Sequence, residues 1–386
     1  MKIALVTNGI YPYVMGGMQK HSYNLVKTLA RKGTQVDLYH FIPKGKEHLE
    51  NPFTEEERGN INEIIIDYPI VRWFPGHYLW TLYLYSKLIF KEFLKRRPVD
   101  FVYAKGFSGW HFLRMKRKGL LEIPFGVNFH GYEMFQKWPS FKVGLKLQLL
   151  KLPVLEHIKH SDYLFSYGGK ITTIIERLGG RGKIIDIPTG INQDWINTSD
   201  DLRNFGKDRV KFIFVGRAER RKGIQEIKEV LRTLPENQFE FHFVGPIPES
   251  QQVSGEHIFY HGPKYDQSEI KNILRTCDVL VCPSYSEGMP NVIMEGMSQG
   301  LAIIATDVGA VAAMVGLENG KLLSPNAITR DLRKSMLEII ERDKRSLADL
   351  KGASLEKVRQ LSWEKIGLMT IDCLKSCISV KNEMSA

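Results

Sequence analysis

Two carboxylates, Glu287 and Glu295, stand eight positions apart in the stretch SEGMPNVIME. Proline is well tolerated in a first helical turn, so we expect a helix to begin near Pro290, between the two acids. The backbone amides at or beside that helix N-terminus, where an anion or a hydroxyl is favoured, would be those of Gly288, Met289 and Asn291. One acid before the helix and one inside it could therefore contact the same ligand at different positions along the helix axis. The alternative is an ordinary acid before a helix and an ordinary surface acid.

A basic cluster, FVGRAERRKG, supplies groups that could bind an anion. Arg217 and Lys222 fall after a strand-like run and before a helix-like run, and Gly216 and Gly223 permit a close approach of the backbone. A guanidinium that forks and an ammonium that acts as a point charge suit the two phosphates of a diphosphate. The alternative is a solvated basic turn.

The first half of the chain offers two weaker candidates. Gly16 and Gly17 open a helical pattern, where their amides can cradle a phosphate or simply form a flexible turn. They are not part of a GxGxxG sequence, so the dinucleotide-binding fingerprint is absent. His130 ends a buried-looking strand beside Gly131, and a histidine there can face a ligand or serve the structure alone.

The elements that must position these residues alternate between strand and helix along both halves of the chain. Strand-like runs lie at 2–7, 35–41, 101–104 and 125–129, and then at 209–215, 239–244, 257–261, 279–283 and 301–306. Helix-like runs lie at 18–32, 224–234, 268–276, 290–299 and, with a break at 361–364, at 354–375. This alternation predicts parallel sheets with helices on both faces.

The polar stretch Asn197–Arg209 is typical of a linker between two domains. We therefore expect an α/β fold with two doubly wound, Rossmann-like domains, residues 1–190 and 191–386, that face each other across a cleft. The last helix, about residues 362–378, is a candidate to pack on the N-terminal domain. Ligands of such sheets bind at the carboxyl ends of the strands, where the polar clusters fall.

The segments VGRAERRKG and CDVLVCPSYSEGMPNVIMEGMSQGLAIIATDVGA resemble the family 4 (group 1) retaining glycosyltransferases of the GT-B fold. The spacing of the two acids, the GxP between them and the ATDVG after them match the family, as do YPYVMGG, the HG at 130–131 and IPTGIN. The resemblance covers nearly the whole chain except residues 43–120, which would bind the acceptor. The chain departs from the family at Gly296, which is more often alanine, and in the charged run Glu219-Arg-Arg221.

The resemblance implies a role for each candidate. Glu295 would accept hydrogen bonds from the ribose of a nucleotide sugar, and Glu287 would hold the sugar's hydroxyls together with the amides of Gly288–Asn291. His130 would lie near the transferred sugar. The groups that would balance charge on the departing diphosphate are Arg217, Lys222 and the amides of Gly16 and Gly17. The remaining donor-binding residues would be Gly216, Met289 and Pro290.

The activity implied is retaining transfer of a hexosyl or N-acetylhexosaminyl group from a nucleoside-diphosphate sugar to a hydroxyl of a glycan or glycolipid, in the assembly of cell-surface polysaccharide or lipopolysaccharide. The family needs no obligatory metal or cofactor, and the sequence has no DxD-like motif where one would be needed. The nearest alternative is a nucleotide-sugar epimerase on the same scaffold. A two-domain solute-binding protein shares the alternation but ordinarily carries an export signal, and the start of this sequence has no such layout.

Lysine and arginine are concentrated in the first half of the chain. Residues 1–190 carry a net charge of +12 and residues 191–386 a net charge of −1. Basic segments that also hold aromatic or aliphatic residues lie at 72–74, 87–97, 114–118 and 137–151. Such segments bind anionic membrane surfaces or simply pack one face on a core. With no run long enough to span a bilayer and no CxxC pair, we expect a cytoplasmic protein with reduced cysteines, peripheral on the inner face of the cell membrane, and no nucleic-acid partner.

Overall fold

The computed structural model describes residues 1–96, 98–138, 141–197 and 209–385. The chain forms two compact units. The first comprises Met1–His130, Leu145–Gly190 and Trp363–Ala386, and the second comprises Gly131–Gly144 and Ile191–Ser362. The short segment Gly131–Gly144, which lies within the first predicted domain, thus groups with the second unit. Of the predicted linker, residues 198–208 lie outside the described residues.

Seven parallel strands form the sheet of the first unit, in the order β3-β2-β1-β4-β5-β6-β7. The strands are β1 (Lys2–Val6), β2 (Gln35–His40), β3 (Ile61–Ile65), β4 (Phe101–Lys105), β5 (Phe125–Asn128), β6 (Tyr163–Ser166) and β7 (Lys183–Asp186). The central strands are mostly apolar and almost fully buried because helices cover both faces of a parallel sheet. Every residue of β4 is buried, although this strand ends in a lysine.

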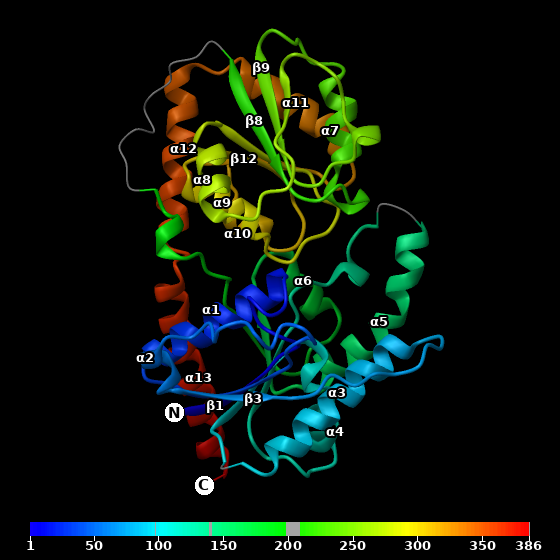
Figure 1. The fold of residues 1–386 in the computed structure, drawn as a ribbon, viewed down its shortest axis with the longest axis vertical. Helices are drawn as coiled ribbons and strands as arrows, with labels where there is room; N and C mark the ends of the chain where they lie inside the picture. The colour runs from blue at the N-terminus through cyan, green and yellow to red at the C-terminus, as the bar shows by residue number, and fades with distance from the viewer. Residues whose placement is uncertain (97, 139–140, 198–208, 386) are drawn as a thin grey trace. The chain divides into compact units, whose positions relative to one another are not determined.

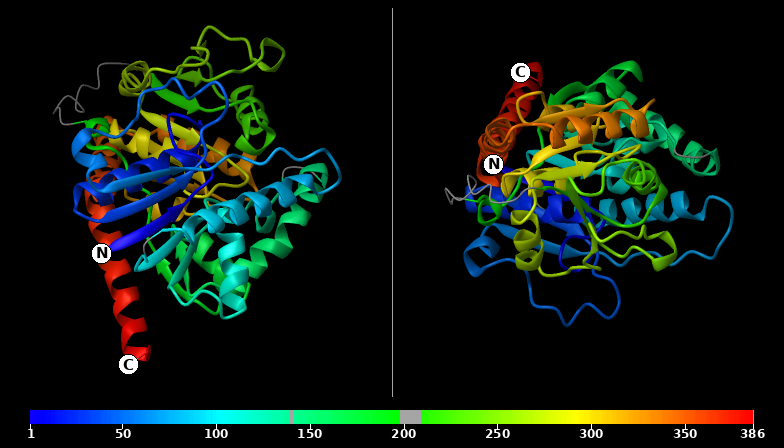
Figure 2. Two further views of the ribbon diagram at one scale, coloured as in Figure 1. Left: turned by 60° about the horizontal axis from the view of Figure 1, so that its bottom comes forward. Right: turned by 90° about the horizontal axis from the view of Figure 1, so that it is seen from above.

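Helices α1 and α13 pack against each other in the first unit (Figures 1 and 2). Its helices are α1 (Gly17–Arg31), α2 (Glu55–Arg58), α3 (His77–Phe93), α4 (Trp110–Arg117), α5 (Phe141–His160), α6 (Lys170–Arg177) and α13 (Trp363–Ser385). A Cβ at Gly367 of α13 would lie 2.2 Å from Thr28 Cγ2 of α1, so glycine allows this close approach. The C-terminal helix of the chain therefore belongs to the first unit.

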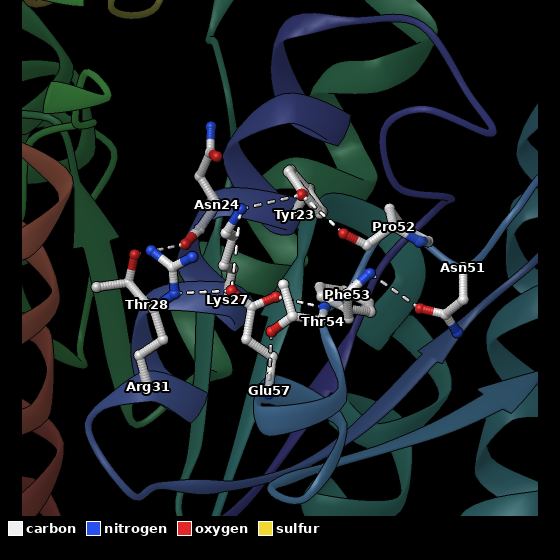
Figure 3. Close-up of polar contacts among 10 residues, drawn as sticks. All are labelled: Tyr23, Asn24, Lys27, Thr28, Arg31, Asn51, Pro52, Phe53, Thr54 and Glu57. Carbon is white, nitrogen blue, oxygen red and sulfur yellow. Dashed lines mark hydrogen bonds and ion pairs between the residues drawn. The ribbon is translucent and has the colours of Figure 1, made fainter. Parts of the chain in front are cut away.

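A polar network holds α1 against α2 (Figure 3). The buried Glu57 carboxylate accepts a hydrogen bond from Arg31 Nε at 2.7 Å, and Lys27 Nζ lies 3.9 Å away. Thr54 and Glu57 form a capping box at the start of α2, in which each side chain accepts a hydrogen bond from the other residue's backbone N–H. These contacts fix the position of the C-terminal half of α1. They therefore also fix the direction of the helix axis towards its N-terminus at Gly17.

Six parallel strands form the sheet of the second unit, in the order β10-β9-β8-β11-β12-β13. The strands are β8 (Val210–Val215), β9 (Phe239–Val244), β10 (Ile258–Tyr260), β11 (Val279–Cys282), β12 (Ala302–Thr306) and β13 (Gly320–Leu323). The helices are α7 (Ile224–Leu231), α8 (Gln267–Arg275), α9 (Asn291–Ser298), α10 (Val311–Met314), α11 (Ile328–Ile340) and α12 (Lys344–Arg359), with short 3-10 turns that include η5 (Arg220–Lys222). Counted within each unit, both sheets contain the order 3-2-1-4-5-6 of doubly wound Rossmann-like domains, to which the first sheet adds a seventh strand, β7, at the edge beside β6. The predicted fold class is confirmed.

Alternating side chains sort the core of the second unit onto the two faces of its sheet. Phe212 of β8 and Val279 of β11 belong to an apolar cluster that includes residues of α7 and α11. The next residue of β11, Leu280, meets α9 instead. A Cβ added to Gly296 of α9 would lie 2.9 Å from Leu280 Cδ2. Glycine at this position, where the chain departs from the family pattern, lets α9 approach the sheet closely.

Candidate functional site

The predicted site residues form two groups, one in each unit, and each group lies in loops at or near a reversal of strand order. In the second unit, Arg217 and Lys222 follow β8, and Glu287 follows β11, which is the neighbour of β8 in the sheet. In the first unit, the Gly16–Gly17 pair follows β1, and His130 follows β5, one strand beyond the neighbour of β1. Ligands of doubly wound sheets bind beside such reversals, at the carboxyl ends of the strands.

Lys222 and Glu287 form an ion pair that links the loops after β8 and β11. Lys222 Nζ lies 2.6 Å from Glu287 Oε1, and Arg221 Nη1 lies 3.8 Å from Glu287 Oε2. The Glu287 side chain is only 8% exposed, so burial makes a positively charged partner necessary. Sequence analysis assigned Lys222 to the diphosphate and Glu287 to the sugar of one ligand. In the structure the two side chains contact each other directly.

The other basic residues of the cluster differ in their partners. Arg217, whose side chain is 70% exposed, pairs with Glu219 at 2.9 Å. Arg220 makes two hydrogen bonds to Glu226, at 2.7 and 2.9 Å. The Tyr285 hydroxyl donates to the same carboxylate at 2.6 Å. Arg220 is therefore held within the fold, whereas Arg217 stands at the surface.

Glycines allow the strand-end loops of the second unit to touch. Gly309 has a φ of +56°, and a Cβ there would lie 2.3 Å from the carbonyl oxygens of Glu287 and Gly288. Ala310 N donates to Gly288 O at 2.7 Å, which fixes the carbonyl of that loop. Likewise, a Cβ at Gly245 would lie 1.9 Å from the oxygen of Gly216. Any larger residue at these positions would push the loops apart.

Gln136 belongs to the site although sequence reasoning did not find it. Its Nε2 donates to Glu287 O at 2.8 Å, and its Oε1 accepts a hydrogen bond from Glu287 N at 3.3 Å. The side-chain amide thus pairs with both polar groups of one residue's backbone. Its chain neighbour Lys137 donates to Pro325 O at 3.0 Å. No local pattern could predict this, because Gln136 lies 151 residues before Glu287.

Helix α9 begins at Asn291, one residue later than Pro290, which is its N-cap. No side chain caps this helix through a hydrogen bond. Met289 is buried, and Glu295 lies about one turn inside α9 with a partly exposed side chain. The backbone between Glu287 and Asn291 therefore leads into a helix N-terminus, as expected, with one predicted acid on either side of it.

The first unit brings Gly17 and His130 into contact. Gly16 is the N-cap of α1 and, being a glycine, has no side chain to cap the helix. A Cβ at Gly17 would lie 2.7 Å from His130 Nε2, so glycine leaves space for the imidazole beside the first turn of α1. The other ring nitrogen, Nδ1, lies 3.0 Å from the hydroxyl of Tyr167. Burial, and then the proximity of Lys105, lower the pKa of His130 to about 3, so this histidine is neutral near pH 7.

The described part of the chain lacks two features. None of its helices has the length and the apolar character to cross a membrane. In the same residues, no group of three or more His, Cys, Asp or Glu side chains could hold a metal ion. The metal independence of the reaction remains a prediction.

Comparisons with known proteins cover both units. A model described as Glycosyltransferase Family 4 matches residues 15–195, and one described as Glycosyl transferases group 1 matches residues 209–342. An uncharacterized glycosyltransferase of Methanocaldococcus jannaschii, MJ1178, is 25% identical over 384 residues, a match that spans 95% of each chain. TuaC of Bacillus subtilis (strain 168), a glycosyltransferase named for teichuronic acid biosynthesis, is 25% identical over 213 residues, which is 53% of this chain and 52% of the relative.

A solved structure supports the fold independently. Sucrose-phosphate synthase from Thermosynechococcus elongatus matches with a TM-score of 0.77 and 19% identity, covering 98% of this chain and 99% of the other. Together with the two family models, this agrees with the motifs and with the strand order of both sheets. The chain belongs to the family 4 (group 1) glycosyltransferases and has the GT-B fold.

Proposed function

We propose that this glycosyltransferase moves a hexosyl or N-acetylhexosaminyl group, with retention, from a nucleoside-diphosphate sugar to a hydroxyl of a glycan or lipid-linked acceptor. The observation that carries the proposal is the 2.6 Å pair between Lys222 and Glu287, at the ends of neighbouring strands. A lysine bound to a carboxylate can exchange it for a phosphate oxygen, which has the same charge and accepts the same hydrogen bonds. The exchange would free Glu287 to accept hydrogen bonds from the sugar.

The remaining contacts of Glu287 fit this exchange. Arg221 stays 3.8 Å from its second carboxylate oxygen and would keep the charge compensated. Gln136 holds both backbone polar groups of Glu287, the N–H and the carbonyl oxygen. Glu287 could therefore turn its carboxylate to the sugar without moving the loop. Glu295, on the far side of the α9 N-terminus, would accept hydrogen bonds from the ribose.

Charge stabilisation is the chemical step that these residues would serve. As the bond between sugar and diphosphate breaks, negative charge grows on the diphosphate, and cations fixed in advance stabilise it. Lys222 would act as a point charge, and the exposed Arg217 could leave Glu219 to bind a phosphate through two N–H groups. The amides of Gly16 and Gly17 would add a helix N-terminus.

In the retaining reaction that we propose, an oxygen of the donor phosphate accepts the proton of the acceptor hydroxyl. Glu287 and Glu295 then bind substrate, and neither acts as a nucleophile. The side-chain cations of the protein would supply the positive charge, so we expect no metal requirement.

An exposed aromatic segment of the first unit favours a lipid-linked acceptor and a peripheral contact with an anionic membrane. Ile70 is 87% exposed and Trp73 75% exposed. The other large exposed residues of this segment are Phe74, Tyr78 and Trp80. Aromatic side chains with a polar edge settle at the level of lipid headgroups, and Arg72 among them would meet anionic lipid. The relative named for teichuronic acid biosynthesis agrees with a role in cell-surface polymer assembly.

The basic segment at 114–118 is a weaker membrane candidate than its sequence suggested. Arg114 and Arg117 both pair with Glu156, at 3.8 and 2.8 Å, and Lys116 pairs with Asp162 at 2.8 Å. Their charges are therefore partly neutralised within the fold. Co-sedimentation with anionic vesicles should weaken strongly in Trp73→Ser/Trp80→Ser and only slightly in Arg114→Gln/Arg117→Gln. The reverse order would return the membrane contact to the basic segment.

Donor use can be tested with a panel of nucleotide sugars. We expect one donor to raise the melting temperature of the protein and to release nucleoside diphosphate when an acceptor extract is added, with EDTA present. The sugar should appear in the acceptor with the anomeric configuration that it had in the donor. Conversion of the nucleotide sugar to an epimer without transfer would instead indicate the epimerase alternative.

A further inference from the structure

Lys105 is a fully buried lysine at the carboxyl end of β4 that the proposed reaction does not use. In the register of the sheet it stands opposite Asn128 of β5, which in turn stands opposite Phe165 of β6. Lys105 Nζ donates to Asn128 Oδ1 and lies 3.0 Å from His21 Nδ1 of α1. Within the described part of the chain, no carboxylate lies within ion-pair distance of this amine.

Lys105 and the groups that face it are buried together in the first unit. Burial without a counter-charge lowers the pKa of Lys105 well below its usual value. Burial also lowers the pKa of His21 well below its usual value, and Lys105 and His130 add to this effect. The rings of Tyr103 and Tyr167 lie beside the amine, with centroids at 5.8 and 5.9 Å. All the groups that face Lys105 are therefore neutral hydrogen-bonding partners or rings.

The hydrogen bonds of Asn128 connect Lys105 to the candidate site. Asn128 Nδ2 donates to Phe165 O at 3.0 Å, which turns the amide oxygen towards Lys105. The same oxygen accepts a second hydrogen bond, at 3.0 Å, from the hydroxyl of Tyr167. Because the single hydroxyl proton of Tyr167 is used there, its oxygen can only accept from His130 Nδ1, 3.0 Å away. In neutral His130 the proton is then on Nδ1, and Nε2 carries a lone pair beside Gly17.

We propose that Lys105 is a positioning residue for sugar transfer: through Asn128 and Tyr167 it holds His130 in the tautomer whose Nε2 accepts a hydrogen bond at the first turn of α1. The group that meets His130 is then an O–H donor, which is a sugar or acceptor hydroxyl and not a phosphate oxygen. The inference rests on the proposed function in one respect, namely that His130 lies near the transferred sugar.

The tautomer can be measured directly. In protein labelled with ¹⁵N-histidine, the His130 signals are identified by their loss in His130→Ala. We expect Nδ1–H and a bare Nε2 in the full-length wild-type protein. Lys105→Met removes both hydrogen bonds of the amine but keeps a side chain of similar length, and should give a mixture of the two tautomers. Lys105→Gln keeps an N–H donor towards Asn128 and should restore the wild-type signal in part.

Kinetics distinguish positioning from a merely structural role. We expect Lys105→Met and Tyr167→Phe each to lower kcat about 10- to 100-fold with little change in the KM for the donor, because the loss is one of alignment. In a His130→Ala background, Lys105→Met should cause no further loss. Tyr163→Phe is the matched control, since it deletes a buried hydroxyl at the other end of β6 that donates to Cys377 O at 2.9 Å, and it should keep the wild-type kcat.

Three outcomes would overturn the inference: an unchanged His130 tautomer in Lys105→Met, an unchanged kcat in that variant, or the same fold-loss with and without His130. A different failure belongs to the proposed function. If His130→Ala has the wild-type kcat, His130 is not near the transferred sugar, and the tautomer measurement alone then decides whether Lys105 positions it.

Discussion

The second unit builds its candidate site from charged pairs, whereas the first unit builds its own around a neutral histidine in a chain of hydrogen bonds. Lys222, Arg221 and Glu287 meet at the strand ends of the second sheet. At the corresponding ends of the first sheet, a neutral His130 is linked to the buried Lys105 through the hydrogen bonds of Tyr167 and Asn128. Both sheets follow the same strand order, so the fold does not impose this difference.

The difference fits the two kinds of ligand group that a sugar transfer involves. A diphosphate that gains charge needs cations, and a carboxylate can occupy them until it binds. Hydroxyl groups need acceptors and donors of fixed direction, for which neutral side chains suffice. The comparison also shows that the net charge of +12 in residues 1–190 does not describe the buried site of the first unit. The following changes should break or sharpen this contrast.

The largest effect should follow the loss of the central cation of the second unit. We expect Lys222→Ala to lower kcat about 100- to 1,000-fold, the loss typical of removing one preorganised charge-stabilising donor. The matched variant Arg217→Ala should lose less, because that side chain is exposed and pairs with Glu219. Single-turnover rates, measured with saturating donor, give the loss for each of the two variants. Equal losses would mean that the exposed Arg217 contributes as much as Lys222. A rise in KM with kcat unchanged would mean that Lys222 contributes uniform binding.

The two acids should separate by ligand. Glu295→Ala should weaken binding of the free nucleoside diphosphate by about 1.5–3 kcal/mol, or about 10- to 150-fold, because its proposed partners are ribose hydroxyls. Glu287→Ala should leave that affinity close to wild type and lower turnover, since its proposed partner is the sugar. Calorimetric titration with the diphosphate measures the first effect. Similar dissociation constants for the two variants would show that the roles are misassigned.

Gln136→Ala tests whether the backbone of Glu287 must be held. Two hydrogen bonds to that residue are lost, each worth about 0.5–1.5 kcal/mol. We expect a drop in kcat of about 5- to 50-fold, with free diphosphate affinity retained. Lys137→Ala, which loses a contact to Pro325 at the next position, is the control and should lose little. A loss of diphosphate affinity in Gln136→Ala would place its effect at the phosphates.

The neutral site of the first unit should respond to acid. Because the folded-state pKa of His130 is about 3 and lies below the unfolded value, the unfolded chain binds the extra proton between these values. The contribution of His130 to stability is therefore complete above about pH 6.5 and is lost as pH falls towards 3. Urea unfolding at pH 7 and pH 5 should show a smaller decrease in stability in His130→Gln than in the wild type. An equal decrease would mean that His130 is protonated in the folded state.

The parts of the fold that could be predicted are those where burial leaves a local signal. The apolar runs of β1, β4, β8 and β12 could be recognised because both of their faces are covered. The edge strands β3 (INEII) and β13 (GKLL) were missed, since some of their residues are exposed and their sequences resemble loops. The internal strand β6 (YLFS) was also missed although all its residues are buried, whereas the edge strand β10 was predicted. Burial therefore left a recognisable signal in most of the central strands but not in all of them.

In the candidate site, too, residues with a local signal could be predicted, whereas contacts between distant residues could not. Glu287 and Lys222 could be proposed from motifs, but their direct pairing depends on two adjacent strands whose loops are 65 residues apart. Lys105 gave one usable signal, a basic residue at the end of a buried strand, but its partners lie 23 and 84 residues away. Contacts of this range depend on sheet order and register, which motif spacing does not report.

The exchange of partners at Lys222 can be observed in a crystal structure of the protein with the nucleoside diphosphate that its donor releases. The account predicts that Lys222 Nζ leaves its present position 2.6 Å from Glu287 Oε1 and binds a phosphate oxygen, while Gln136 still holds the Glu287 backbone. A structure in which the diphosphate is bound and the Lys222–Glu287 pair is intact would contradict it.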